Sequence, residues 1–389
     1  MRLLNAARSL ALALAGRAAS VFRRRFGLLN GSDVKSVRDL MVFWARRRAK
    51  GLGPSPVSSA DGNAALYRTL NLNTKEVFYD LNVENYSANS EILQKNDGIR
   101  SLDGLYRRGT AFIVAAGPSL DKNIDQLSRI QGRWPIFACD AALPMLTKHG
   151  IEPDYIMIVD SKAWQQRFFE GVKPGTKTKL LAIACVHPEA VKAWPGETMF
   201  FNSWGDEKDE AFQLKVGKDF GSIGVGGNVS TGLLWLVTAF CEASRVILVG
   251  HDFSYPPGRY YAKGGIDELA SGKGGKYWWD ANGNTVLTNV SLWAYRIYTE
   301  KYIEDLGLLD AKLILDGREP FGWKVINATE GGILGTTETF GVNSEVIESA
   351  ALSEVLDQLD SESVGSGACT PAALSATEDR ESFRALAGV

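Results

Sequence analysis

The middle of the chain alternates short apolar runs with stretches of helical periodicity. The runs lie at residues 111–115, 135–139, 155–159, 180–184, 199–202 and 246–249. Apolar runs of this length are typical of strands buried on both faces, and helical stretches between them favour a parallel sheet covered by helices on both sides. We therefore predict an α/β fold with a doubly wound, mostly parallel sheet.

A different pattern follows the last of these runs. Residues 277–281 and 284–288 read YWWDA and NTVLT, and they flank Asn282 and Gly283. An Asn-Gly pair between two strand-like segments suits a type I′ turn, because both central positions of that turn need positive φ. We predict a small β-hairpin insertion here.

The two ends of the chain lack a core pattern. Residues 1–29 mix apolar residues with arginines, as a basic interfacial helix does, and the apolar stretch at 10–16 is too short to span a bilayer. This leader is either a peripheral membrane anchor or a segment without fixed structure, and a Gly- and Pro-containing linker follows it to residue 61. We assign residues 62–340 to the α/β domain, 341–360 to a C-terminal helix and 361–389 to a disordered tail.

The composition narrows the classes of partner and cofactor. The chain has 43 basic and 45 acidic side chains, so it exerts no long-range attraction on nucleic acid. Its four cysteines form no CxxC pair, and its three histidines complete no zinc motif. A reducing, cytoplasmic location fits this cysteine usage.

Residues that follow the predicted strands are the candidates for ligand binding, because open parallel sheets bind ligands at the carboxyl ends of their strands. Gly117, Pro118 and Ser119 form a turn between the first run and a helical stretch, where phosphate is attracted. Asp140 and Asp160 follow the next two runs. Such carboxylates either hold ribose hydroxyls, an acceptor or Mg²⁺, or cap the next helix or turn.

Two later segments add further candidates. Ser230, Thr231 and Gly232 end a glycine-rich stretch and open an apolar helix, so they form either an anion cradle or a flexible connection with Ser230 as the N-cap. His251 and Asp252 follow the run at 246–249. His251 is either a general base, since an imidazole titrates near neutral pH, or a hydrogen-bonded structural side chain.

The order of these motifs resembles that of the motility-associated-factor (Maf) and MptE-like family. The motifs are AAGPSLD at 115–121, GIEPDY at 150–155, STG at 230–232, VGHDFSY at 249–255, the Asn-Gly hairpin and NATEGG at 327–332. The resemblance implies a Rossmann-like, sialyltransferase-like fold. It also implies one of two activities: sugar transfer to flagellin from an activated nonulosonic acid, or diphosphokinase transfer of pyrophosphate from ATP to a hydroxymethylpterin.

The sugar-transfer branch is favoured by a second resemblance. Segments 112–120 and 230–250 are similar to the large and small sialyltransferase motifs, which hold a cytidine nucleotide. This similarity implies that Gly117, Pro118 and Ser119 approach the donor nucleotide, together with Asp140. It also implies that Ser230, Thr231 and Gly232 contact the nucleotide or the sugar carboxylate.

The chain departs from the glycosylating relatives after residue 255. Those relatives often carry a His-Ala pair, where this chain has Arg259 and Tyr260 in the sequence RYYA. A tyrosine is a poor base at neutral pH, so His251 or Asp252 is expected to replace the missing imidazole. Arg259 and Tyr260 then become candidates for contacts with the leaving group or the acceptor. Two residues of the NATEGG motif, Asn327 and Glu330, are candidates for the same contacts.

We therefore expect a transferase that moves a nonulosonic sugar from a CMP donor to a hydroxyl group. His251, Asp252 and Asp160 are the catalytic candidates, and no cofactor is required. The acceptor is a protein such as flagellin, or a glycan or lipid-linked precursor. The first alternative is pyrophosphoryl transfer from ATP with Mg²⁺ on Asp160 and Asp252 or Asp140. The second is a relative that binds a nucleotide or glycan without catalysis.

Overall fold

A computed structural model describes residues 77–96, 98–203, 218–266, 275–336 and 347–365 of the chain. Its main feature is a nine-stranded sheet in the order β11-β10-β7-β1-β2-β3-β4-β5-β6, in which every neighbouring pair is parallel. The strands are β1 Thr110–Val114, β2 Ile136–Cys139, β3 Tyr155–Ile158, β4 Lys179–Ile183, β5 Thr198–Ser203, β6 Ser222–Ile223, β7 Arg245–Val249, β10 Lys324–Asn327 and β11 Glu348–Ser349. The predicted doubly wound α/β fold is confirmed.

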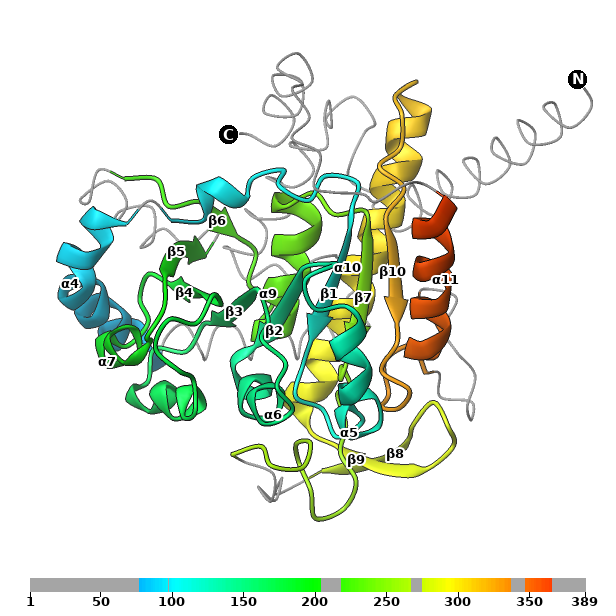
Figure 1. Cartoon of the computed structure of the whole chain (residues 1–389), viewed down its shortest axis with the longest axis horizontal. Coiled ribbons are helices and arrows are strands. Elements are labelled where there is room, and N and C mark those ends of the chain that lie inside the picture. The colour runs from blue at the N-terminus through cyan, green and yellow to red at the C-terminus, as the bar shows by residue number, and fades with distance from the viewer. Residues whose placement is uncertain (1–76, 97, 204–217, 267–274, 337–346, 366–389) are drawn as a thin grey trace, which may run out of the picture.

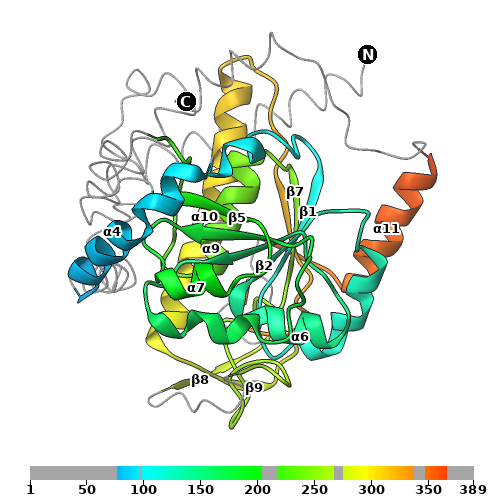
Figure 2. The same cartoon turned by 60° about the vertical axis from the view of Figure 1, so that its left-hand side comes forward.

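Helices cover both faces of the sheet (Figures 1 and 2). One face packs against α5, the 3-10 segment η2, α6 and α11, and the other against α9, its π-helical continuation η5 and α10. Smaller helical elements surround the β3 to β5 end of the sheet. The bounds are α4 Tyr79–Lys95, η1 Gly98–Leu102, α5 Leu120–Asn123, η2 Ile124–Arg129, η3 Asp140–Ala142, α6 Leu143–Lys148, η4 Ala163–Phe169, α7 Pro188–Ala193, α9 Val229–Trp235, η5 Leu236–Phe240, α10 Val290–Leu315 and α11 Leu352–Gly365.

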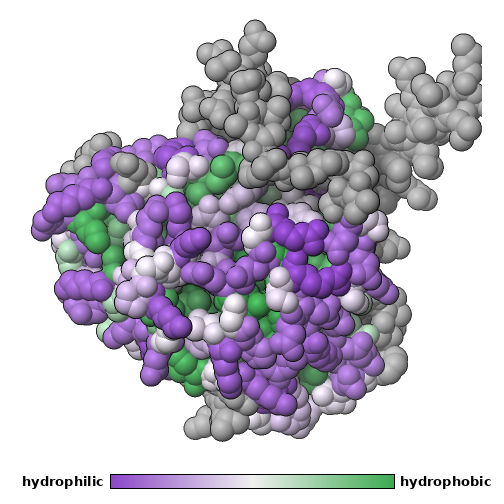
Figure 3. All heavy atoms as spheres, in the orientation of Figure 1, coloured by the Kyte–Doolittle hydropathy of each residue, from purple (hydrophilic) through white to green (hydrophobic). Residues whose placement is uncertain are grey.

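The alternation of side chains along the central strands explains the two layers. Phe112 and Val114 of β1 belong to the cluster under α5, α6 and α11, whereas Ala111 and Ile113 belong to the cluster under α9 and α10. All four side chains are fully buried. Successive residues of a strand point to opposite faces, so a strand covered on both sides is apolar at every position. On the face of the molecule seen in Figure 3, apolar residues appear only as separate patches between hydrophilic ones.

The predicted hairpin is present, but its turn differs from the prediction. Strands β8 Lys276–Trp279 and β9 Thr285–Thr288 are antiparallel, with Trp279 opposite Thr285. Gly283 has a φ of 80°, whereas Asn282 does not have positive φ, so the type I′ turn was wrong. The Asp280 carboxylate instead accepts hydrogen bonds from the backbone amides of Asn282 and Asn284, at 2.9 and 2.7 Å. A side chain thus organises a longer connection.

The predicted terminal segments coincide only partly with the described residues. The leader and linker at 1–61 lie outside them, as does the tail from residue 366 onward. The C-terminal helix, expected at 341–360, begins at Leu352 and ends at Gly365, because Glu348 and Ser349 pair with β10 as the edge strand β11. Across the described ranges, no helix combines the length and apolar character needed to cross a bilayer.

Candidate functional site

Three loops interlock at the carboxyl ends of β1, β7 and β10. Ser119, after β1, donates its backbone amide to the Asp252 carboxylate at 3.2 Å and its hydroxyl to the same group at 2.5 Å. Asp252, after β7, accepts at its backbone oxygen a hydrogen bond of 2.7 Å from the amide of Ile333. Burial raises the pKa of the Asp252 carboxyl to about 7, against the lowering effect of the Ser119 hydrogen bonds.

Glycines permit this close approach. A Cβ atom at Gly117 would lie 2.0 Å from Oδ2 of Asp252, and one at Gly332 would lie 2.3 Å from the Cα of Asp252. Gly332 also has a φ of 69°, which disfavours other residues. The backbone amide of Gly117 donates to the carbonyl of Gly250, and Pro118 has no amide hydrogen. The donors of the 117–119 turn therefore hold the neighbouring loop together rather than pointing to an open phosphate site.

His251 is a buried side chain, only 3% exposed. Its backbone amide donates to the Thr329 hydroxyl at 3.0 Å, and its Nδ1 lies 3.1 Å from the carbonyl oxygen of Val249. That carbonyl can only accept, so Nδ1 carries the proton and Nε2 is left as an acceptor. Nε2 has no hydrogen-bond partner among the described residues. Burial lowers the pKa of His251 to about 4, which keeps the ring neutral at physiological pH.

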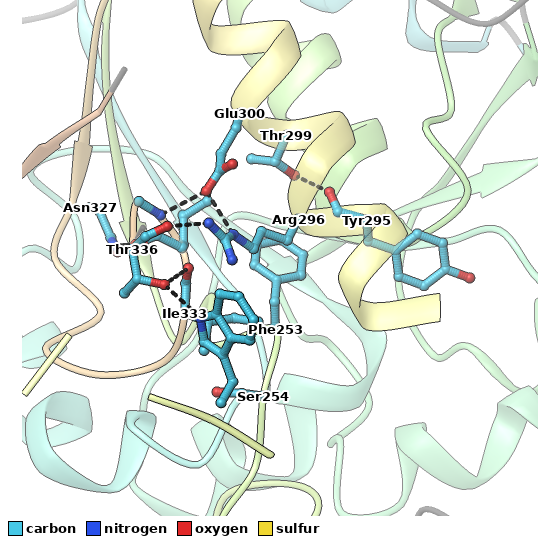
Figure 4. A network of polar contacts seen from close by, with 12 residues as sticks. Phe253, Ser254, Tyr295, Arg296, Thr299, Glu300, Asn327, Ile333 and Thr336 are labelled. Carbon is cyan, nitrogen blue, oxygen red and sulfur yellow. Dashed lines mark hydrogen bonds and ion pairs between the residues drawn. The ribbon is translucent and has the colours of Figure 1, made fainter. Parts of the chain in front are cut away.

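The loop after β10 is anchored by side chains of helix α10 (Figure 4). Arg296, which is buried, donates to the Glu300 carboxylate at 2.8 Å and to the backbone oxygen of Thr336. Glu300 also accepts from the amide of Gly335 at 2.9 Å. A buried guanidinium paired with a carboxylate is costly to separate, so this network fixes the end of the loop that presses on Asp252.

Asn327 and Glu330, predicted to contact the leaving group or acceptor, have partners within the protein. The Asn327 side chain accepts from the amide of Thr329 and donates to the carbonyl of Leu334. The Glu330 carboxylate accepts from Asn123 at 3.2 Å and from the amide of Leu352 at 3.1 Å. Both side chains therefore join the β10 loop to neighbouring elements.

Arg259 and Tyr260 lie in a segment that covers the turn after β1. Arg259 forms an ion pair with Asp121, whose carboxylate also accepts from the amide of Lys263 at 2.8 Å. The Tyr260 hydroxyl accepts from the Asn289 side chain at 3.3 Å, and burial raises its pKa above the ordinary value. The Tyr255 ring packs on Tyr260 with 4.8 Å between centroids. Residues 259–263 therefore pack over the turn that follows β1.

Asp140 and Asp160 lie at the ends of the adjacent strands β2 and β3. Burial raises the pKa of the Asp140 carboxyl to about 7; the neighbouring charge of Asp160 raises it further, and Arg167 lowers it. The Asp140 carboxylate also accepts a hydrogen bond of 2.8 Å from the amide of the next residue, Ala141. Asp160 is partly exposed and accepts from the amide of Lys162 at 3.1 Å. Within the described ranges, no three His, Cys, Asp or Glu side chains are grouped to hold a metal ion.

Helix α9 brings Ser230, Thr231 and Gly232, at its start, to the same carboxyl edge of the sheet. It begins after β6, which is parallel to the other strands, and packs on β1, β2 and β3. Its N-cap is Asn228 rather than Ser230: the Asn228 side chain accepts from the amide of Thr231 at 2.9 Å and from the hydroxyl of Ser230 at 3.1 Å. A Cβ atom at Gly232 would lie 3.3 Å from Sδ of Met157, so this position lies against β3.

A stripe of asparagines on α4 is a feature that sequence reasoning missed. Asn85 donates to the carbonyls of Ser161 and Cys185, at 2.8 and 2.9 Å. Asn89 donates to the carbonyls of Ala184 and Val186, at 3.1 and 2.8 Å. These carbonyls follow β3 and β4, so α4 satisfies backbone groups that a sheet leaves open where its strands end. The helical spacing of Asn82, Asn85 and Asn89 was the available signal.

Comparisons with known proteins show to which proteins parts of this chain are similar. An uncharacterized protein of Treponema pallidum (strain Nichols) is 40% identical over 50 residues, which make up 13% of this chain and 24% of that protein. A solved MAf glycosyltransferase from Magnetospirillum magneticum AMB-1 superposes with a TM-score of 0.42 at 17% identity, covering 67% of this chain and 37% of that one. The chain thus spans well under half the length of either protein. Residues 84–258 match the family model described as 6-hydroxymethylpterin diphosphokinase MptE-like, so this segment of the chain is similar to the MptE-like family.

Proposed function

We propose that the protein is a transferase that moves a nonulosonic sugar from a CMP-activated donor to a hydroxyl group. The acceptor hydroxyl attacks the anomeric carbon, CMP leaves, and a carboxylate takes the proton. The observation that carries the proposal is spatial. The turn at 117–119 and the helix start at 230–232 resemble two nucleotide-holding motifs and lie at the same edge of the sheet as Asp140 and Asp160. The amides of the 117–119 turn are used within the protein, so a nucleotide would contact the partly exposed Gly117 rather than these donors.

The burial of Asp160, His251 and Asp252 supports a different role for Asp160 than for the other two residues. Asp160 is partly exposed and can reach an acceptor or the donor ribose, whereas His251 and Asp252 are 3% and 7% exposed. A pKa of about 4 makes His251 a weak base at neutral pH. In this proposal Asp160 takes the acceptor proton or orients the acceptor. His251 and Asp252 hold the loops that shape the site.

A second candidate is Mg²⁺-dependent pyrophosphoryl transfer from ATP to a hydroxymethylpterin, which the description of the matching family favours. Asp140 and Asp160 would hold the metal, because they follow adjacent strands and the charge of Asp160 raises the pKa of the Asp140 carboxyl. Asp252 fits this role less well, since Ser119 contacts its carboxylate through both backbone and side chain. The metal would supply charge for the phosphate oxygens.

Other parts of the proposal concern location and partners. A cytoplasmic location agrees with nucleotide-activated donors, and the acceptor would be a protein such as flagellin, or a glycan or lipid-linked precursor. The basic residues 1–29, which lie outside the described residues, would bring the enzyme to a membrane-linked acceptor.

The test uses the full chain with two sets of substrates. CMP release from a CMP-nonulosonate with an acceptor, and AMP release from ATP with Mg²⁺ and hydroxymethylpterin, are followed in parallel. We expect CMP release, and we expect Asp160→Asn to lower kcat about 100-fold while CMP affinity changes less than threefold. Asp316→Asn, on the far end of α10, is the matched control and should retain activity. AMP release without CMP release would establish the second candidate, and nucleotide binding without turnover would establish a non-catalytic binder.

A further inference from the structure

Trp164 presents a large apolar side chain to solvent at the carboxyl edge of the sheet. It lies in η4, four residues after Asp160, and is 40% exposed. An indole combines a large apolar surface with one polar N–H group, and tryptophan is enriched at interfaces for that reason. Because Trp164 follows Asp160 so closely in the chain, a ligand that reaches this carboxylate can also contact the indole.

The exposure of Trp164 does not come from a loosely held segment. Ser161 is fixed by α4, through a hydrogen bond to the Asn82 side chain and one of 2.8 Å from Asn85 to its backbone oxygen. After Trp164, Phe168 and Phe169 are buried in the core. The indole is therefore held on a segment anchored on both sides, which limits the entropy lost when a ligand stacks on it.

One cation connects Trp164 with the acid pair. The Arg167 guanidinium lies 4.2 Å from the centroid of the Trp164 ring and 5.0 Å from that of Phe168. The same guanidinium is close enough to Asp140 to counteract part of the burial effect on that carboxyl's pKa. An aromatic surface, a guanidinium and two carboxylates thus adjoin one another where β2 and β3 end.

We propose that Trp164 and Arg167 form a stacking subsite for the planar heteroaromatic ring of the substrate. An indole offers van der Waals contact to any such ring, and an adjacent guanidinium strengthens the stack and attracts the phosphate that accompanies a nucleotide. This inference rests on the proposed function, because it assigns the ring of the same nucleotide. Both candidate reactions use a ring of this class: a cytosine, an adenine or a pterin.

The experiment compares Trp164→Ala and Trp164→Phe with the wild-type full chain by isothermal titration. The probes are CMP, ATP with Mg²⁺, hydroxymethylpterin, and ribose 5-phosphate, which has no ring. Trp279→Ala is the matched control, because Trp279 is 43% exposed but lies on the hairpin strand β8. Melting curves establish that each variant is folded.

We expect Trp164→Ala to weaken one ring-bearing probe about tenfold, Trp164→Phe to restore most of the affinity, and Trp279→Ala to change nothing. Ribose 5-phosphate should bind all proteins equally. The probe whose affinity falls in Trp164→Ala, whether CMP, ATP or hydroxymethylpterin, identifies the ring that occupies the subsite. The subsite is wrong if Trp164→Ala binds every probe as the wild type does, or loses ribose 5-phosphate equally. If CMP binds the wild type and Trp164→Ala weakens no probe, the subsite fails while the proposed function stands; if no probe binds the wild type, both fail.

Discussion

Asp252→Asn tests the interlocked loops through the dependence of stability on pH. The pKa of the Asp252 carboxyl is about 7 in the folded protein, against an ordinary value of 3.8 for aspartate. Between these values the folded state holds a proton that the unfolded state has released, so the free energy of unfolding falls as pH rises from about 4 to about 7. Stabilisation by the neutral carboxyl is complete below the unfolded pKa and is lost above the folded one.

The expected size follows from the shift. Between pH 5 and pH 8 the carboxyl crosses about two of the pKa units that separate the folded and unfolded values, and each unit is worth about 1.4 kcal/mol, so the loss is about 3 kcal/mol. Asparagine has no such titration. The difference in unfolding free energy between wild type and Asp252→Asn should therefore shift by about 3 kcal/mol in favour of the variant on going from pH 5 to pH 8. Urea unfolding at both pH values measures it.

Two further variants sharpen this comparison. Asp140→Asn should behave similarly, because burial also raises the pKa of Asp140 to about 7. Glu91→Gln is the control: Lys95 lowers the pKa of the exposed Glu91, so its contribution is already complete above pH 5 and should not change up to pH 8. If Asp252→Asn shows the same destabilisation at both pH values, the buried, neutral carboxyl at the loop junction is not present and the reasoning is wrong.

Two other substitutions test the packing around the site. In chemical unfolding, Gly332→Ala should destabilise the protein by at least 2 kcal/mol more than Gly132→Ala. Both glycines have positive φ, but only an alanine at 332 would meet the backbone of Asp252. Equal losses of unfolding free energy in the two variants would refute the close contact. Asn89→Ala should lower the free energy of unfolding by about 2–4 kcal/mol, because it removes the donors to two buried carbonyls after β4. Ser87→Ala, on the exposed side of α4, should lower it little. Equal effects of the two variants would show that the asparagine contacts contribute nothing.

The central strands could be predicted because each one appears in the sequence as a run of consecutive apolar residues. β1, β2 and β3 are buried on both faces, so nearly all of their positions are apolar and the runs stand out from the surrounding sequence. The short strands β6 and β11 could not be predicted, because they have two residues each and include serine and glutamate. They are strands only because a neighbouring strand supplies their hydrogen bonds, and that neighbour is chosen by the tertiary fold.

The candidate site was predictable only to the level of its loops. The rule that ligands bind at the carboxyl ends of parallel strands selected the loops at this edge of the sheet as candidates. It could not predict that Asp252 pairs with Ser119, because these residues are 133 positions apart and either could equally have faced solvent. Nor could the sequence show that His251 turns its Nδ1 to its own strand, since that orientation is decided by the packing of the β10 loop around Thr329.

Along the carboxyl edge of the sheet, the buried candidate residues and the partly exposed ones lie at the ends of different strands. At the β7 and β10 end, His251 and Asp252 are buried under interlocked loops, and at the β4 end α4 covers the freed carbonyls. Between them, Gly117, Ala141 and Asp160 remain partly exposed. A group that accepts a proton from a substrate must come within hydrogen-bond distance of it, which a side chain sealed by its own neighbours cannot do without rearrangement. Substrate chemistry should therefore take place where β1, β2 and β3 end, with the buried histidine and aspartate acting only through the loops they hold.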